Sequence, residues 1–194
     1  MSLTPPFQLT VCGIEELDGH CQAGVTHVLS ILDPDVPIPP AFDTFDQHRR
    51  LELRFYDVIE ETLTGAPPQR VHVEQLLAFG RDLAGEPPSR AHLLVHCHAG
   101  ISRSTAAMLL ILAQAQPSTP AVDLAAELLR IRAKAWPNLR MLEFGEPMLH
   151  RNGTLIAAAA GLYRHQLNER PHLAEVMTTN GRGREVRAAA VRPS

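Results

Sequence analysis

The stretch His96-Cys97-His98-Ala99-Gly100-Ile101-Ser102-Arg103-Ser104 constrains the fold of this chain more than any other. Before it lies the apolar run 91–95, which is typical of a short buried strand. After it comes the segment 105–115, which is almost wholly apolar, too long for a typical strand and rich in Ala, Leu and Met, so it predicts a buried helix. The stretch is therefore predicted to be a tight turn from a strand into a helix. Backbone N–H groups and the positive helix end converge there and can bind an anion.

The residue types in this turn suit chemistry on a phosphoryl group. The helix end and the loop amides favour the thiolate form of Cys97, so we expect a nucleophile that is ionised near neutral pH. Gly100 lets the backbone turn without a Cβ in the cradle. Arg103 can donate two parallel hydrogen bonds to phosphate oxygens, which a lysine cannot reproduce. Ser104 can donate a hydrogen bond to the departing sulfur, and His96 is placed to orient the loop.

The run HCHAGISRS closely resembles the signature of cysteine-dependent protein tyrosine phosphatases, Cys-x5-Arg followed by Ser or Thr. Within that superfamily it is most similar to the compact dual-specificity branch. The resemblance implies an α/β fold with this loop at the carboxyl end of a central strand, and no metal or cofactor. It carries over Cys97 as nucleophile, Arg103 as phosphate clamp and Ser104 as the residue that assists thiolate departure. It also implies a phosphate-binding loop made of His98, Ala99, Gly100, Ile101, Ser102 and Arg103.

A general acid is needed as well, because the leaving oxygen must be protonated. In the resembled family this is an aspartate on a loop upstream of the nucleophile. Asp57 is the best match, since it follows the predicted strand 49–55 and opens a polar loop. Its separation from Cys97 is somewhat longer than is usual in that family, and an insertion at 65–69 can account for the excess. The rival carboxylates are Glu60, Glu61, Asp46 and Asp82.

The rest of the chain alternates strand and helix patterns before a run of helices. The other predicted strands span 7–14, 26–32 and 49–55, and the other predicted helices span 71–83, 120–135, 140–151 and 155–167. Asn138, after Trp136 and Pro137, is predicted to shape a turn. This order predicts a single α/β domain with a central, mostly parallel sheet and helices on both faces.

The pattern dissolves after about residue 168. Residues 178–194 are rich in Arg, Gly and Ala and offer no large apolar face, so they are predicted to be mobile. We therefore expect a phosphatase domain at 1–168 and a C-terminal extension at 169–194.

Composition narrows the class of protein. The formal net charge is −3 and there is no strong basic block, which disfavours nucleic acid or a membrane as the main partner. The cysteines Cys12, Cys21 and Cys97 form no disulfide-rich or metal-binding pattern, although Cys12 or Cys21 could resolve an oxidised Cys97 as a disulfide. With no leader-like or membrane-length apolar run, a cytoplasmic location is expected.

These features predict a phosphomonoester hydrolase that acts on phosphotyrosine in proteins through a phosphocysteine intermediate, with action on phosphoserine and phosphothreonine left open. A phosphoinositide or other small-molecule phosphatase is the nearest competing hypothesis, disfavoured because the variable loop positions carry no lysine. A phosphate-binding pseudoenzyme and a sulfur-transfer or arsenate-reducing thiol enzyme also stay open as hypotheses. The oligomeric state is not predicted.

Overall fold

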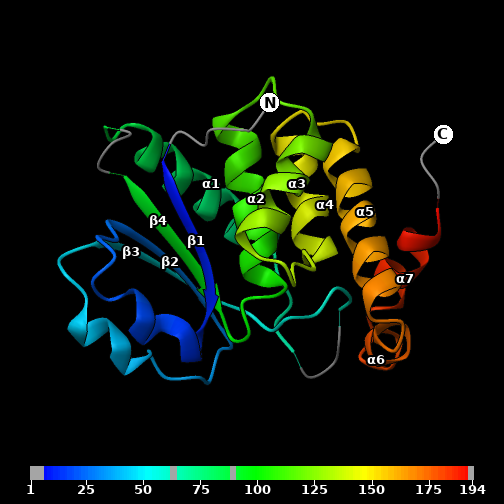
Figure 1. Cartoon of the computed structure of the whole chain (residues 1–194), viewed down its shortest axis with the longest axis horizontal. Coiled ribbons are helices and arrows are strands. Elements are labelled where there is room, and N and C mark those ends of the chain that lie inside the picture. Colours follow the sequence, from blue (N-terminus) through cyan, green and yellow to red (C-terminus); the bar gives the residue numbers. More distant parts are fainter. Residues whose placement is uncertain (1–6, 62–64, 88–90, 192–194) are drawn as a thin grey trace.

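Four parallel strands form the centre of the structure (Figure 1). The strands are β1 (Gln8–Gly13), β2 (His27–Leu32), β3 (Arg49–Arg54) and β4 (His92–Cys97). Their order across the sheet is β1-β4-β2-β3, and each neighbouring pair runs parallel. All residues of β4 are buried, as expected for a central strand with both faces covered. The predicted parallel sheet is confirmed.

The structure is a computed structural model of the 194-residue chain and describes residues 7–61, 65–87 and 91–191. Residues 62–64 of the polar loop after Asp57 and residues 192–194 of the predicted extension lie outside this description. No helix in the described ranges has the length and apolar character needed to cross a membrane.

Helices lie on both faces of the sheet, as predicted, but the two faces are covered unequally (Figure 1). The α-helices on one face are α1 (Arg70–Ala84), α2 (Arg103–Ala115), α3 (Ala121–Ile131), α4 (Leu139–Met148) and α5 (Thr154–Glu169). The other face carries two short 3-10 helices, η1 (Ile14–His20) and η2 (Pro40–Thr44). The connection that holds η2 is rich in proline, which removes backbone donors and prevents a longer helix.

The alternation of side chains along β4 divides the core in two. Leu93 and Cys97 belong to the main core under the α-helices, whereas Leu94 belongs to a smaller core under η1 and η2. Successive side chains of a strand point to opposite faces, so the Cys97 sulfur lies on the α-helix side of the sheet. The following helix α2 is buried from Arg103 to Ala113, which confirms the predicted buried helix.

The C-terminal segment differs from its prediction. It forms α6 (Leu173–Thr179) and α7 (Gly183–Ala190), and α7 packs along α5 (Figure 1). The predicted lack of regular structure is therefore wrong for the described residues. The reason is that α7 docks through small and charged side chains such as Ala189 and Glu185, which an apolar pattern does not detect. A domain boundary after residue 168 stays a prediction.

Candidate active site

The nine-residue stretch connects the central strand to the most buried helix. Cys97 ends β4 and Arg103 begins α2, so the loop lies at the carboxyl end of the sheet beside the N-terminus of α2. The Cys97 thiol is almost fully buried, and its Sγ lies 3.2 Å from Ser104 Oγ. This contact joins the predicted nucleophile to the hydroxyl that is predicted to assist its departure.

The carbonyl groups of the loop all accept hydrogen bonds from surrounding elements. The pairs are His98 O with Ile14 N, Ala99 O and Gly100 O with Arg132, Ile101 O with Trp136 N, and Ser102 O with Ala106 N. Since the N–H and C=O of one peptide point in opposite directions, the amides of residues 99–103 face the inner side of the loop. None of them donates to an acceptor in the described part of the chain. The loop thus presents a row of inward N–H groups, an arrangement that binds anions.

Arg132 braces this loop from outside. Its Nε donates to Gly100 O at 2.8 Å and its Nη2 to Ala99 O at 3.0 Å. Glu16 holds the same guanidinium through two bonds of 3.0 and 2.7 Å, and it also accepts from Gly13 N. The hydrogen bond from Arg132 lowers the pKa of Glu16 to about 2, so this carboxylate stays charged at neutral pH. Sequence reasoning missed this pair.

Gly100 meets the requirement predicted for it. Its φ is +66°, in the left-handed region that favours glycine. A Cβ at this position would lie 2.4 Å from the carbonyl carbon of Cys12 in the neighbouring strand. Both the backbone conformation and the space therefore require glycine at the bend of the loop.

The Arg103 side chain is buried and anchored through one nitrogen only. Its Nη1 donates to Asp33 Oδ1 at 2.5 Å and to Phe55 O at 2.6 Å. Its Nε makes no hydrogen bond within the described residues, which leaves the Nε and Nη2 side of the fork to donate to a ligand. Sequence reasoning missed Asp33 as a site residue. Its position directly after β2, at the same edge of the sheet as the loop, was the available signal.

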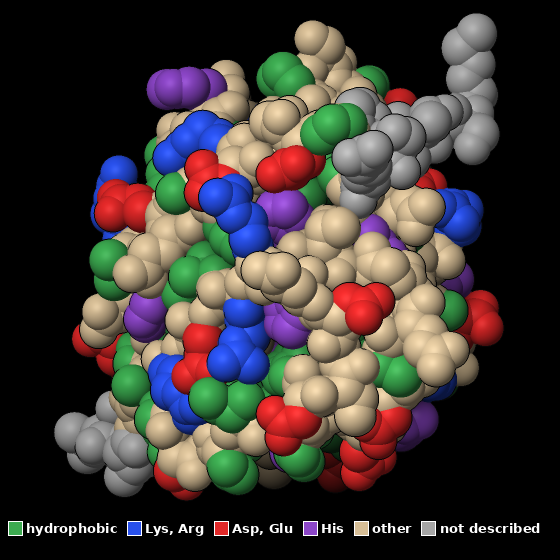
Figure 2. Space-filling view, turned by 90° about the vertical axis from the view of Figure 1, so that its left-hand side faces the viewer, with side chains coloured by type: hydrophobic (Ala, Val, Ile, Leu, Met, Phe, Trp, Pro, Cys, Tyr) green, Lys and Arg blue, Asp and Glu red, His purple; other side chains and the backbone are tan. Residues whose placement is uncertain are grey.

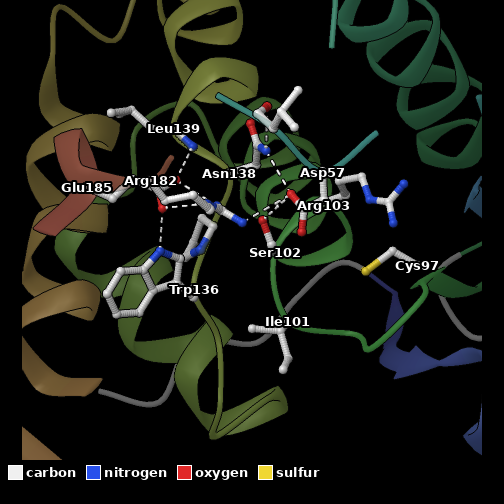
Figure 3. Close-up of polar contacts among 12 residues, drawn as sticks. Asp57, Cys97, Ile101, Ser102, Arg103, Trp136, Asn138, Leu139, Arg182 and Glu185 are labelled. Atoms are coloured by element: carbon white, nitrogen blue, oxygen red, sulfur yellow. Dashed lines mark hydrogen bonds and ion pairs between the residues drawn. The ribbon is translucent and has the colours of Figure 1, made fainter. Parts of the chain in front are cut away.

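Asp57 is the only one of the proposed acids that the structure brings to the loop. Its Oδ1 accepts from Ser102 Oγ at 2.7 Å, from Asn138 Nδ2 at 2.9 Å and from Arg182 Nη1 at 3.2 Å (Figure 3). The carboxylate is directed toward these three donors, and the Cys97 sulfur lies outside the group (Figure 3).

The charge state of Asp57 follows from these neighbours. Burial raises the pKa of its carboxyl, but the positive charges of Arg182 and Arg103 and the hydrogen bonds from Ser102 and Asn138 outweigh burial. The net result is a pKa below the ordinary value, because each neighbour stabilises the ionised form. Asp57 is thus an ion-paired carboxylate in this structure.

The rival acids lie elsewhere. Glu60 pairs with Arg184 at 2.5 Å and the exposed Glu61 pairs with Arg140 at 3.1 Å. Asp46 and Asp82 are exposed. None of these four is joined to the loop by a hydrogen bond or ion pair within the described residues.

His96 lies behind the loop, on the face of the sheet opposite Cys97. Its Nε2 lies 2.7 Å from Ser30 Oγ in β2, and its ring is buried near that of Phe42. Burial lowers the pKa of His96 to about 4, so the ring is neutral at physiological pH. A neutral ring bonded to the neighbouring strand supports a role in orienting the loop. The exposed side chain of His98 lies at the rim instead.

The register of β1 and β4 bears on a disulfide between Cys12 and Cys97. Cys12 pairs with His96, and Cys97 pairs with Gly13. Cys12 belongs to the small core and Cys97 to the main core, on opposite faces of the sheet. Burial raises the pKa of Cys12 to about 12, which makes it a poor nucleophile. The geometry therefore argues against Cys12 as the resolving thiol.

A buried polar cluster connects the C-terminal segment to the site. Glu185 accepts from Trp136 Nε1 at 2.5 Å, from Leu139 N at 3.0 Å, and from Arg182 at 2.8 and 2.7 Å (Figure 3). Trp136 and Leu139 flank Asn138, which caps α4 by accepting from Met141 N. Sequence reasoning missed Arg182 and Glu185, because the segment that carries them was predicted to be mobile.

Removing residues 178–194 is therefore expected to destabilise the protein. The truncation leaves the buried Trp136 Nε1 without its acceptor and Asp57 without Arg182, at about 1–3 kcal/mol for each buried group left unpaired. A loss of about 2 kcal/mol lowers Tm by about 4–8 °C for a chain of this size. Thermal unfolding followed by circular dichroism measures the shift. The exposed Arg187→Gln in α7 is the control and should stay near the parent value; an unchanged Tm in the truncated protein would show that the segment does not stabilise the domain.

The comparisons with known proteins agree with this geometry. No protein family model matches the chain, and no curated protein matches it in sequence. Among solved structures it is similar to human DUSP28, with a TM-score of 0.55 and 19% identity over 76% of this chain and 96% of that one. It is also similar to DUSP15, with a TM-score of 0.51 and 23% identity over 88% of this chain and 95% of that one. For Tk-PTP in the active form the values are 0.52, 20%, 74% and 92%. At these identities the likeness concerns the fold, and the chain therefore has the fold of dual-specificity and protein tyrosine phosphatases.

Proposed function

We propose that this protein is a phosphomonoester hydrolase that removes phosphate from phosphotyrosine in proteins through a phosphocysteine intermediate. One observation carries the proposal. The Cys97 sulfur lies at the base of a loop whose carbonyls all accept hydrogen bonds from neighbouring elements and whose amides face inward, beside an arginine with part of its fork unbonded. Such a loop can hold a phosphoryl group in line with the sulfur.

In the proposed reaction the Cys97 thiolate attacks phosphorus, and the bond to the leaving oxygen breaks. The loop amides and Arg103 donate to the three phosphoryl oxygens and stabilise the charge that they carry in the transition state. Asp57, when protonated, gives its proton to the leaving oxygen. Water then attacks the phosphocysteine with Asp57 as base, and Ser104 donates a hydrogen bond to the departing sulfur at its 3.2 Å position.

The charge on the surface supports a protein substrate over a polyanionic partner. On the face turned toward the viewer in Figure 2, acidic and basic side chains are interspersed among the described residues, without a broad basic area. The formal net charge of the chain is −3. Attraction to nucleic acid or to anionic lipid relies on a basic surface. A phosphorylated protein is therefore the proposed partner.

A phosphoinositide substrate is the second candidate. The hollow beside the loop is lined by His98, Ala99 and Lys134, which is the only lysine in the chain. A solved structure of similar fold is PTPMT1 in complex with PI(5)P, with a TM-score of 0.51 and 16% identity over 78% of this chain and 95% of that one. Against this substrate, the loop positions between Cys97 and Arg103 carry no lysine to meet further phosphates.

Assays of phosphotyrosyl and phosphoseryl peptides and of phosphoinositide vesicles, run side by side, discriminate these substrates. The highest kcat/KM is expected for phosphotyrosyl peptides. A higher value for phosphoinositides would transfer the proposal to the second candidate. Binding of phosphopeptide without turnover of any substrate would identify a phosphate-binding pseudoenzyme.

Asp57→Asn is expected to slow substrates with poor leaving groups far more than those with good ones, by up to about a hundredfold or more. A good leaving group departs without much protonation, whereas one of high pKa needs the acid. The variant should also flatten the alkaline limb of the pH–rate profile, because that limb reports loss of the acid's proton. A series of aryl phosphates measures both effects. Glu60→Gln and Glu61→Gln are the controls; a leaving-group effect in one of them and not in Asp57→Asn would reassign the acid.

A further inference from the structure

The C-terminal segment contributes one side chain that reaches Asp57. Arg182 lies directly before α7 and is 5% exposed. Its Nη1 is 3.2 Å from Asp57 Oδ1 (Figure 3). Two segments far apart in the sequence therefore meet at the proposed general acid, and the charge that meets it comes from outside the phosphate-binding loop.

Arg182 is fixed in this position from its other side. Its Nε and Nη2 both donate to Glu185, at 2.8 and 2.7 Å. Glu185 is fully buried and is itself held by Trp136 Nε1 and Leu139 N. With two nitrogens held by Glu185 and its side chain buried, Arg182 has its Nη1 directed at Asp57 and is not placed to bind a substrate. This geometry is that of a positioning residue.

The charged and titratable groups around Asp57 come from several elements. Arg103 of α2 is the second cation, and its charge is already paired with Asp33 at 2.5 Å. Tyr163 of α5 is buried beside the cluster, and burial raises its pKa, so the phenol stays neutral. Arg182 is therefore the nearby cation that is hydrogen-bonded to Asp57 in addition to its own carboxylate partner.

The state of Glu185 limits how much of this charge is cancelled. Burial raises the pKa of Glu185, partly offset by the charge of Arg182 and by the hydrogen bonds that Glu185 accepts. Burial disfavours the charge of Arg182, but the carboxylates of Asp57 and Glu185 outweigh burial and keep the guanidinium protonated. A cation at 3.2 Å in a partly buried site stabilises the ionised form of Asp57 over its acid form.

We propose that Arg182 holds the Asp57 carboxylate in an ion-paired resting position and so sets the pH range in which Asp57 can act as an acid. The inference rests on the proposed function, because it assigns a regulatory contact to the acid of that reaction. A general acid must carry its proton, and a neighbouring cation favours its loss. The C-terminal segment thereby shifts the alkaline limb of the reaction toward lower pH and draws the carboxylate toward Ser102 and Asn138.

Arg182→Gln is expected to move the alkaline limb of the kcat/KM profile upward by about 1 pH unit, since an opposite charge at this range lowers a carboxyl pKa by about 1–3 units. Arg182→Lys keeps the charge and should stay close to the parent profile. Arg187→Gln removes an equal charge from an exposed position of α7 and should leave the profile unchanged. A merely structural role would lower kcat without moving the limb.

Two further arms keep the test decisive. Arg182→Gln leaves Glu185 buried without its cation, so the double variant Arg182→Gln/Glu185→Gln is measured in parallel and should show the same upward shift. The Asp57 carboxyl is also titrated directly by carbon-13 NMR, with Asp57→Asn used to assign its signal. Its midpoint should rise by the same amount in both variants. This readout needs no catalytic activity.

The outcomes separate the two proposals. An upward shift of both the limb and the NMR midpoint supports the inference. A midpoint that stays at the parent value in Arg182→Gln and in the double variant overturns it, even if the protein is an active phosphatase. A shifted midpoint in a protein that hydrolyses no phosphomonoester supports the contact between Arg182 and Asp57 and overturns the proposed function.

Discussion

The Cys97→Ser variant is expected to lose all measurable turnover while it still binds inorganic phosphate. A serine hydroxyl is not ionised near neutral pH and is a weak nucleophile without an adjacent base. The loop that binds the phosphoryl group is left intact, because its carbonyls are held by Ile14, Arg132 and Trp136 and not by the sulfur. Steady-state assays with an aryl phosphate measure turnover, and calorimetric titration with phosphate measures binding.

The thiol itself supplies the matching controls. Iodoacetate should modify Cys97 well below pH 8, and phosphate should protect it, because the same loop stabilises a thiolate and an oxyanion. Cys12→Ser changes a buried thiol on the opposite face of the sheet and should retain activity. Substantial turnover in Cys97→Ser would refute the phosphocysteine intermediate.

The parts of the fold that follow from local pattern were predictable. The four strands lie within a residue or two of their predicted limits, because each is a short apolar run that ends at a turn signal. The loop was predictable because a strand, a glycine bend and a buried helix follow one another without interruption around Cys97 and Arg103. Asp57 was predictable because parallel strands bring their carboxyl ends to one edge of the sheet, and β3 ends just before it.

The braces of the site were not predictable in the same way. Arg132 and Glu16 are 116 positions apart, and Arg182 lies far beyond Asp57. In the sequence each of these residues looks like an ordinary surface charge, and only the packing of α3, η1 and α7 around the loop brings them together. The docking of α7 depends on a buried ion pair and a tryptophan N–H, so apolar periodicity gives no signal for it.

The unequal covering of the sheet has the same kind of cause. Helices on both faces were predicted from the alternation of strands and helices. The connections after β1 and β2 are short or rich in proline, so they form only 3-10 turns over the second face. Asp33 lies in the second of these connections, directly after β2. Its role as the anchor of Arg103 depends on the order of strands across the sheet, which periodicity does not give.

Arg103→Lys is expected to lose nearly as much activity as Arg103→Ala, although the lysine keeps the charge. In the structure Nη1 is committed to Asp33 Oδ1 and Phe55 O, while Nε and Nη2 remain to donate side by side to two phosphoryl oxygens. A lysine has a single nitrogen, which would have to choose between the anchor and the ligand.

The expected loss is on the order of 3 kcal/mol or more in transition-state stabilisation, which is about a hundredfold in kcat/KM. Comparing kcat/KM for the two variants with one aryl phosphate measures it, and circular dichroism checks that both fold. Arg140→Lys, a change at an arginine that pairs with the exposed Glu61, is the matched control and should retain activity. Near-normal turnover in Arg103→Lys would mean that charge alone suffices, and the fork geometry would then have no part in catalysis. If both Arg103 variants fold and lose activity to the same degree, the planar, anchored guanidinium is what the reaction requires.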